Sequence, residues 1–132
     1  MTQVFRQAEA TVLGLPGRKA LEIVSGARGA KGVTLRLVEI PVPRPGDAPR
    51  SRHEHQDFEE CIFVLSGQGT TQADSGEYPL IPGDTLLISP GDRHATRNTG
   101  TEPLLLLCFF PVPEIASVIS ERGRSPEDSA RQ

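Results

Sequence analysis

Short apolar runs separated by turn residues recur along most of this chain. From Val33 to Glu39 the apolar residues mostly alternate with polar ones, and this period of two is typical of a strand with one buried face. Comparable runs cover Ala20–Ser25, Glu60–Ser66, Thr70–Ala73, Tyr78–Leu80, Thr85–Ser89 and Leu104–Phe110. Many short strands at regular spacing predict an all-β sandwich or barrel.

Prolines and glycines interrupt the strand pattern at defined places. Pro41, Pro43 and Pro45, followed by Gly46, predict a loop that continues to Arg50. Near the end of the chain, Pro113 suits a first helical position, and the apolar residues that follow share one helical face. We therefore expect a short helix over residues 113–122, followed by a disordered polar tail over residues 123–132.

Length and composition narrow the classes of protein. The 132 residues suffice for one domain, which we expect to span residues 1–132 with its core over about residues 20–112. A net charge of −3 argues against a nucleic-acid partner. The apolar stretch Leu104–Val112 is too short to span a membrane, and no secretory signal is evident. Cys61 and Cys108 are expected to be reduced, buried thiols of a soluble, cytoplasmic protein.

The three histidines of the chain, His53, His55 and His94, suggest a metal site. His53 and His55 are two residues apart and would face the same side of a strand. Glu60 opens the next strand, and strand alternation favours it over Glu59 as the inward carboxylate. One histidine alone would be a surface residue, but the group of imidazoles with one carboxylate suits a divalent transition metal such as Fe, Mn, Ni or Zn.

These residues resemble the two motifs of the cupin family. The first motif, G-x5-H-x-H-x3,4-E-x6-G, is matched by His53, His55, Glu60 and Gly67. The second, G-x5-P-x-G-x2-H-x3-N, is matched in spacing by Gly83, Gly91, His94 and Asn98. The sequence departs from the motifs at two turn positions, Asp47 in place of glycine and Ser89 in place of proline.

The resemblance implies a small single-domain cupin with a jelly-roll β-barrel. In such a protein, one divalent metal ion per chain would be held inside the barrel by His53, His55, Glu60 and His94. Asn98 would be structural. Family members often form dimers by packing sheets together, so a homodimer is expected. The outward face of Cys61, Phe63 and Leu65 would be covered by another sheet, either within the chain or from a partner.

Residues beside the expected site bear on the substrate. Ile62 and Val64 would share a face with Glu60 and give an apolar wall, and Thr96 shares a face with His94. Arginine at an inward position would favour an anionic substrate. The candidates are Arg36, Arg50, Arg52 and Arg97, of which strand alternation turns the last three outward. Asp57 and Glu59 are candidates for proton transfer, although a solvated acidic turn is the simpler interpretation.

The sequence thus leads to three hypotheses about function. The first is a mononuclear metal-dependent cupin enzyme that acts on a small organic substrate chelating the metal through oxygen. Within it the ligand set favours a dioxygenase over a non-redox lyase, decarboxylase or isomerase. The second is a non-catalytic cupin that binds a small ligand. The third, a purely structural metal site, fits poorly because structural zinc sites are usually closed and rich in cysteine.

Overall fold

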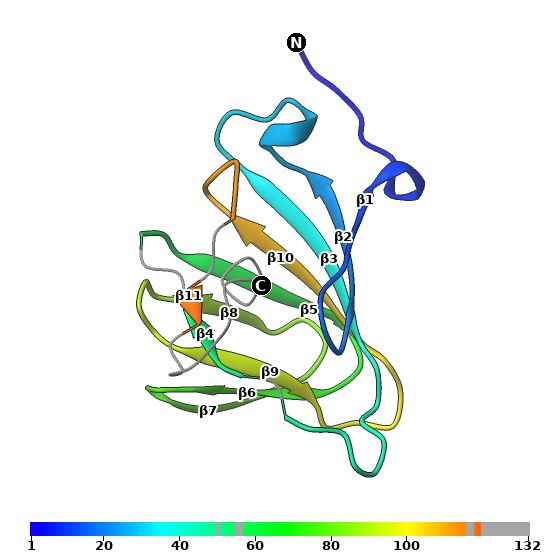
Figure 1. Ribbon diagram of the computed structural model, residues 1–132, viewed down its shortest axis with the longest axis vertical. Helices are drawn as coiled ribbons and strands as arrows, with labels where there is room; N and C mark the ends of the chain where they lie inside the picture. The colour runs from blue at the N-terminus through cyan, green and yellow to red at the C-terminus, as the bar shows by residue number, and fades with distance from the viewer. Residues whose placement is uncertain (50, 55–56, 116–117, 120–132) are drawn as a thin grey trace.

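The computed structural model of the chain describes residues 1–49, 51–54, 57–115 and 118–119 (Figure 1). Strands dominate this part of the chain. Its helical elements are two 3-10 turns, η1 (Gln7–Glu9) and η2 (Gly26–Arg28). The strands form two sheets in which all pairs are antiparallel, as the alternation of apolar and polar residues predicts for an all-β barrel.

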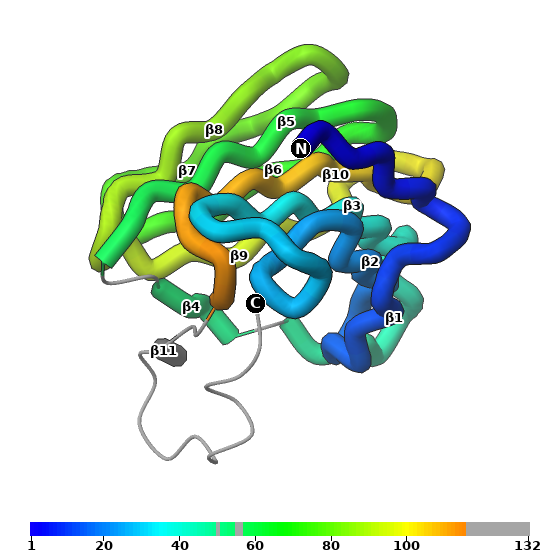
Figure 2. Tube along the Cα trace, turned by 90° about the horizontal axis from the view of Figure 1, so that it is seen from above, coloured from blue at the N-terminus to red at the C-terminus, as the bar shows by residue number. Residues whose placement is uncertain are grey.

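The larger sheet has six strands in the order β1-β2-β3-β10-β5-β8. Their bounds are β1 (Thr11–Leu13), β2 (Lys19–Val24), β3 (Thr34–Ile40), β10 (Leu104–Phe110), β5 (Glu60–Ser66) and β8 (Thr85–Ile88). Figure 2 shows the two edges of this sheet at opposite ends of the molecule, with β1 and β2 far from β8. The predicted strands over residues 60–66 and 104–110 form with the expected bounds.

The smaller sheet has five strands in the order β11-β4-β9-β6-β7. Their bounds are β11 (Val118–Ile119), β4 (His53–Glu54), β9 (His94–Asn98), β6 (Gly69–Ala73) and β7 (Gly76–Leu80). In Figure 1, β9, β6 and β7 lie in the lower part of the view, below β2, β3 and β10 of the larger sheet. The two candidate histidine strands, β4 and β9, are therefore neighbours in the same sheet.

The core lies between the inner faces of the two sheets. Alternate residues of β3, β5 and β10 are buried, and Val64, Leu104 and Phe110 have essentially no exposed surface. Full burial of such a side chain stabilises the fold by about 1.5–3 kcal/mol. Because side chains alternate along each strand, Glu60 lies on the same inward face of β5 as Val64 and is also buried.

Asn98 connects the end of β9 to the two neighbouring segments. Its Nδ2 donates to the carbonyl oxygens of Ile40, at 3.0 Å, and Glu102, at 2.8 Å, and its Oδ1 accepts from the backbone N–H of Gly100, at 2.8 Å. These three hydrogen bonds all join the side chain to backbone groups. This residue stabilises the β9–β10 turn.

The short helix expected over residues 113–122 is absent from the described part of that range. Residues 118 and 119 instead form β11, in which Val118 lies opposite Glu54 and Ile119 opposite His53. Valine and isoleucine are β-branched and suit a strand. Backbone pairing with β4 outweighs a weak local helical pattern. Residues 113–115 form no helix either, whereas residues 116–117 and 120–122, and the expected tail over residues 123–132, lie outside the described residues.

Among the described residues, no helix combines the length and the apolar character that crossing a membrane requires.

Candidate metal centre

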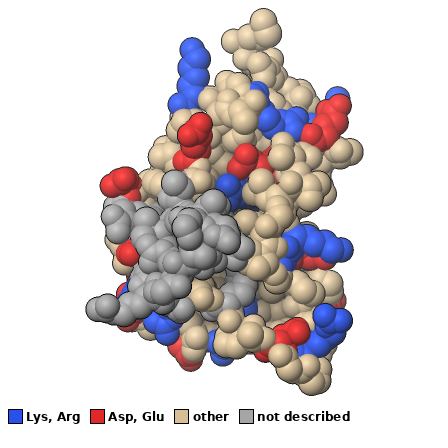
Figure 3. All heavy atoms as spheres, viewed as in Figure 1, with Lys and Arg blue, Asp and Glu red and all other residues tan. Residues whose placement is uncertain are grey.

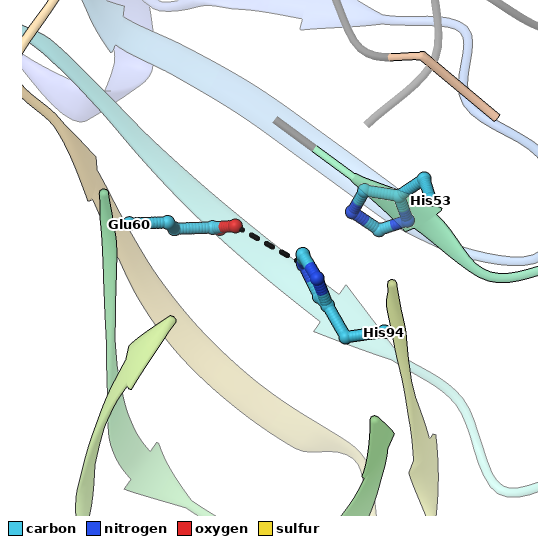
Figure 4. A group of neighbouring side chains, drawn as sticks. All are labelled: His53, Glu60 and His94. Carbon is cyan, nitrogen blue, oxygen red and sulfur yellow. Dashed lines mark ion pairs between the residues drawn. The ribbon is translucent and has the colours of Figure 1, made fainter. Parts of the chain in front are cut away.

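Three of the four expected ligands meet inside the barrel. His53 begins β4 and His94 begins β9, and the two residues are directly opposite each other in the strand pair. Glu60 begins β5 in the other sheet. The exposed fractions of His53, Glu60 and His94 are 8%, 1% and 1%. Figure 4 shows the carboxylate and the two imidazoles converging from the two sheets.

The spacing of the candidate ligand atoms is close to that of a metal site. One ligand atom each from His53, Glu60 and His94 lies within 4.8 Å of the other two. The rings of His53 and His94 have their centroids 4.3 Å apart, and Nε2 of His94 lies 3.3 Å from Oε1 of Glu60. Nitrogen and oxygen ligands that share a transition metal at about 2.0–2.2 Å lie roughly 3–4 Å apart. Two imidazoles and a buried carboxylate at this spacing fit a divalent transition metal.

A backbone carbonyl sets the orientation of the His94 ring. Nδ1 of His94 lies 2.8 Å from the carbonyl oxygen of Asp92, in the turn that precedes β9. Nδ1–H donates to this oxygen, which leaves Nε2 directed at Glu60 as a lone-pair donor for an ion. Burial alone would lower the pKa of His94, but the hydrogen bond to Glu60 and the charge of Glu60 outweigh it, and the pKa is raised.

The neighbouring acidic residues do not face the site. Glu59 and Asp57 are exposed, whereas Glu60 is buried, as strand alternation predicts. The simpler interpretation of Asp57 and Glu59, a solvated acidic turn, agrees with their exposure. His55 lies outside the described residues, and its part in the site stays a prediction.

A pocket adjoins the three candidate ligands. Part of its space is open to solvent. Its apolar walls are formed by Val38, Ile40, Ile62 and Leu106. Thr96 also lines it, as its shared face with His94 predicts, and its Oγ1 lies 2.6 Å from Oγ1 of Thr71. Val64 is buried in the core but does not line this pocket.

Of the arginines considered from sequence, the three that the structure describes, Arg36, Arg52 and Arg97, do not line the pocket. Arg36 faces the barrel interior, where its Nε and Nη2 each lie 3.0 Å from Oε1 of Glu22. Arg52 pairs with Asp74 at 3.2 Å, and Arg97 is exposed. Arg50 lies outside the described residues.

Sequence reasoning missed a different arginine, Arg18, which lines the pocket. It lies immediately before β2, two residues from the fully buried Ala20. Extension of the strand alternation backward from Ala20 would have placed Arg18 on the inward face.

Cys108 also lines the pocket, and both cysteines are free. In the β5–β10 pair, Cys108 lies opposite Ile62 and Cys61 lies opposite Phe109, so the two thiols are on opposite faces of the sheet. This excludes a disulfide between them, in agreement with the expectation of reduced thiols, but only Cys108 is buried as expected, whereas Cys61 is half-buried. Burial raises the pKa of the Cys108 thiol well above its usual range. The charge of Glu60 adds to the rise, and the charges of Arg36 and Arg18 oppose it.

Comparison with known proteins agrees with this architecture. The Cupin domain family matches residues 38–110, and the chain belongs to the cupin family. The polyketide cyclase RemF from Streptomyces resistomycificus has the same fold, with a TM-score of 0.72 at 18% identity over 100% of both chains.

Two curated relatives have higher identity. L-ectoine synthase of Vibrio campbellii is 31% identical over 74 residues, which are 54% of this chain and 58% of that protein. Auxin-binding protein 1 of Arabidopsis thaliana is 30% identical over 129 residues, which are 89% of this chain and 62% of that protein. The chain therefore spans less than two thirds of the length of either relative.

Proposed function

We propose that this chain is a mononuclear metal-dependent cupin enzyme that acts on a small organic substrate through a chelated oxygen. His53, His55, Glu60 and His94 would hold one divalent ion. The observation that carries the proposal is the convergence of three buried ligand residues at the wall of a pocket. A site that opens into a pocket leaves coordination positions for substrate, which a closed structural site does not.

The bound ion would act as a Lewis acid that polarises an oxygen atom of the substrate. The chain would supply the remaining elements of the site. The carbonyl oxygen of Asp92 orients the ring of His94, and Glu60 contributes the negative charge that attracts a cation. The apolar walls exclude water around the non-reacting part of the substrate, and Thr96 contributes a hydroxyl to the pocket.

Two reaction classes use such a centre. The name of L-ectoine synthase supports non-redox chemistry, in which the ion polarises a substrate oxygen. The set of imidazoles with one carboxylate supports the second class, an Fe(II)-dependent dioxygenase. Turnover of diketone, catechol and thiol substrates by the metal-loaded protein, with and without oxygen, separates the two. Turnover that continues without oxygen would support the non-redox class, and turnover matched by oxygen uptake would support the dioxygenase.

A non-catalytic ligand-binding role is the alternative that the name of auxin-binding protein 1 supports. Tight binding of a small molecule by the metal-loaded protein, without turnover in either assay, would favour this role over the enzyme.

The proposed partners are a small molecule and a second copy of the chain. Phe63, Leu65, Leu87 and Phe109 are exposed on the outer face of the larger sheet. An apolar face of this kind suits packing against a second sheet.

Acting on a small molecule does not require a strongly charged surface. On the face of the molecule shown in Figure 3, acidic and basic side chains are interspersed, so neither sign of charge dominates this face.

A further inference from the structure

One exposed carboxylate connects the two chain segments that carry His53 and His94. Nε of Arg93 donates to Oδ2 of Asp74 at 2.8 Å, and Nη1 of Arg52 donates to Oδ1 of Asp74 at 3.2 Å. Arg93 immediately precedes His94, and Arg52 immediately precedes His53. The carboxylate of Asp74 therefore joins the two residues that are next to the candidate ligands in the chain.

The β6–β7 turn, which contains Asp74, is also bound to the turn that precedes β9. The backbone N–H of Asp74 donates to the carbonyl oxygen of Arg93 at 3.0 Å and to Oδ1 of Asp92 at 3.1 Å. The hydroxyl of Ser75 donates to Oδ2 of Asp92 at 2.7 Å. Because the carbonyl oxygen of Asp92 orients the ring of His94, the β6–β7 turn fixes the residue that sets this orientation.

The bridge reinforces a short strand pair. Among the described residues, β4 and β9 pair at one position, with His53 opposite His94. Figure 4 shows the two rings beside each other, and their centroids are 4.3 Å apart. A strand pair this short is at best marginally stable by itself. The contacts of Asp74 with Arg52 and Arg93 give β4 and the turn before β9 a second connection.

Asp74 is ionised in this arrangement. The hydrogen bond from Arg93 holds the pKa of Asp74 below its ordinary value, the charges of Arg93 and Arg52 act in the same direction, and desolvation opposes them. The side chains of Arg52, Asp74 and Arg93 are 40%, 37% and 46% exposed. Exposed ion pairs add little to folding stability. Removal of the bridge should therefore leave a folded protein in which the metal centre can be studied.

We propose that Asp74 is a positioning residue of the metal centre, which holds His53 and His94 in the mutual orientation that lets both bind one ion. This inference rests on the proposed function. Asp74 acts on His53 through Arg52, and it acts on His94 through Arg93 and the turn that precedes β9. Residues that orient metal-binding histidines change the metal affinity when they are removed.

Titration of the metal-free protein with Co²⁺ tests this role, because the visible absorption of bound Co²⁺ depends on the geometry of its ligands and requires no substrate. Asp74→Ala should bind Co²⁺ about tenfold more weakly than the wild type, the lower end of the loss expected for an outer partner of a metal ligand, and with an altered spectrum. Asp74→Glu keeps a carboxylate for the two arginines. It should restore most of the affinity and the wild-type spectrum.

Arg52→Gln separates positioning from simple attraction between charges. Loss of Asp74 removes a negative charge and would weaken binding of a cation through charge alone, whereas loss of Arg52 removes a positive charge and would strengthen it. If position decides the affinity, both variants bind Co²⁺ more weakly. Asp84→Ala is the matched control. It removes a carboxylate that accepts from the backbone N–H of Ile81 at 3.0 Å, between β7 and β8, and should leave the affinity and the spectrum unchanged.

The possible failures are distinguishable. Wild-type affinity and spectrum in Asp74→Ala would overturn the inference. Tighter binding by Arg52→Gln would also overturn it, because charge would then explain the effect of Asp74. An equal loss in Asp84→Ala would overturn it as well, since any turn carboxylate would have the same effect. In these three cases the wild type still binds the ion and the proposed function stands. A wild type that binds no Co²⁺ would instead refute the proposed function, and the inference with it.

Discussion

Nε2 of His94 lies 3.3 Å from Oε1 of Glu60, although the two residues belong to different sheets. His94 begins a strand of the five-stranded sheet, and Glu60 begins a strand of the six-stranded sheet. Both side chains are almost fully buried. The candidate metal centre therefore depends on the packing of the two sheets as well as on the local turns.

Acid is expected to weaken metal binding. The hydrogen bond and charge of Glu60 outweigh the effect of burial and hold the pKa of His94 above its ordinary value of 6.5. A metal ion must displace this proton. The apparent affinity for Zn²⁺ or Mn²⁺ should therefore fall as the pH decreases through the raised pKa, by up to about tenfold per pH unit. Competition titrations between about pH 8 and about pH 5 would measure this, and an affinity independent of pH would contradict it.

The folding stability of the metal-free protein should change with pH in the direction opposite to the metal affinity. A raised folded-state pKa means that the His94–Glu60 pair contributes stability that is fully present below the unfolded-state pKa of histidine. This contribution is lost as the pH rises through the folded-state pKa. Urea unfolding of the metal-free wild type should show the change, and His94→Gln should remove it.

Asn98→Ala should destabilise the fold by about 2–4 kcal/mol, because it removes both donors to the carbonyl oxygens of Ile40 and Glu102. Urea unfolding measures the loss. Arg97→Ala is the control, since Arg97 is exposed on the same strand, and its effect should stay within about 0.5 kcal/mol. Equal effects of the two substitutions would contradict a structural role of Asn98.

Gly67→Ala should cost more than about 2 kcal/mol of stability. Gly67 has a φ of +84°, and a Cβ there would lie 2.5 Å from the carbonyl oxygen of Pro103 and 2.8 Å from Cα of Leu104. Gly14→Ala is the matched control, because a Cβ at that position meets nothing within 4 Å. Thermal unfolding measures both losses. Equal melting temperatures of the two variants would show that the close approach at Gly67 does not determine stability.

Phe63→Arg and Leu87→Arg should convert the proposed dimer to a monomer. Each places a charge on the exposed apolar face of the larger sheet, where pairing would bury it without a partner. Light scattering after gel filtration measures the mass. Tyr78→Arg, on β7 of the other sheet, should leave the dimer intact. A monomeric wild type, or dissociation by all three variants, would contradict the proposed interface.

Strand alternation predicted the parts of the site that depend on one strand. It placed Glu60 inward and Glu59 outward, and it placed Thr96 on the face of His94. It could not fix the direction of Arg36, because Val33–Val42 gives the period of a strand but not the position of the core. The structure resolves this, with Arg36 inward and paired with Glu22 of the neighbouring strand.

The failures of sequence reasoning occur where pairing between distant segments decides the outcome. The expected helix over residues 113–122 is replaced in part by β11, whose two residues gain backbone partners only from β4. Arg18 was overlooked because it lies in a turn, before the apolar run that marked the strand. Strand alternation counted back from Ala20 gives its inward direction, but that it lines the pocket depends also on how β2 packs within the sheet.

The central claim is that the buried cluster holds a metal ion. The most direct measurement is the metal content of the purified wild type, without affinity histidines, beside His53→Ala, Glu60→Ala and Glu59→Ala. The account predicts one ion per chain in the wild type and in Glu59→Ala, whose carboxylate is exposed, and loss of the ion from the other two variants. A wild type that holds no metal even after reconstitution, or variants that retain it equally, would contradict the account.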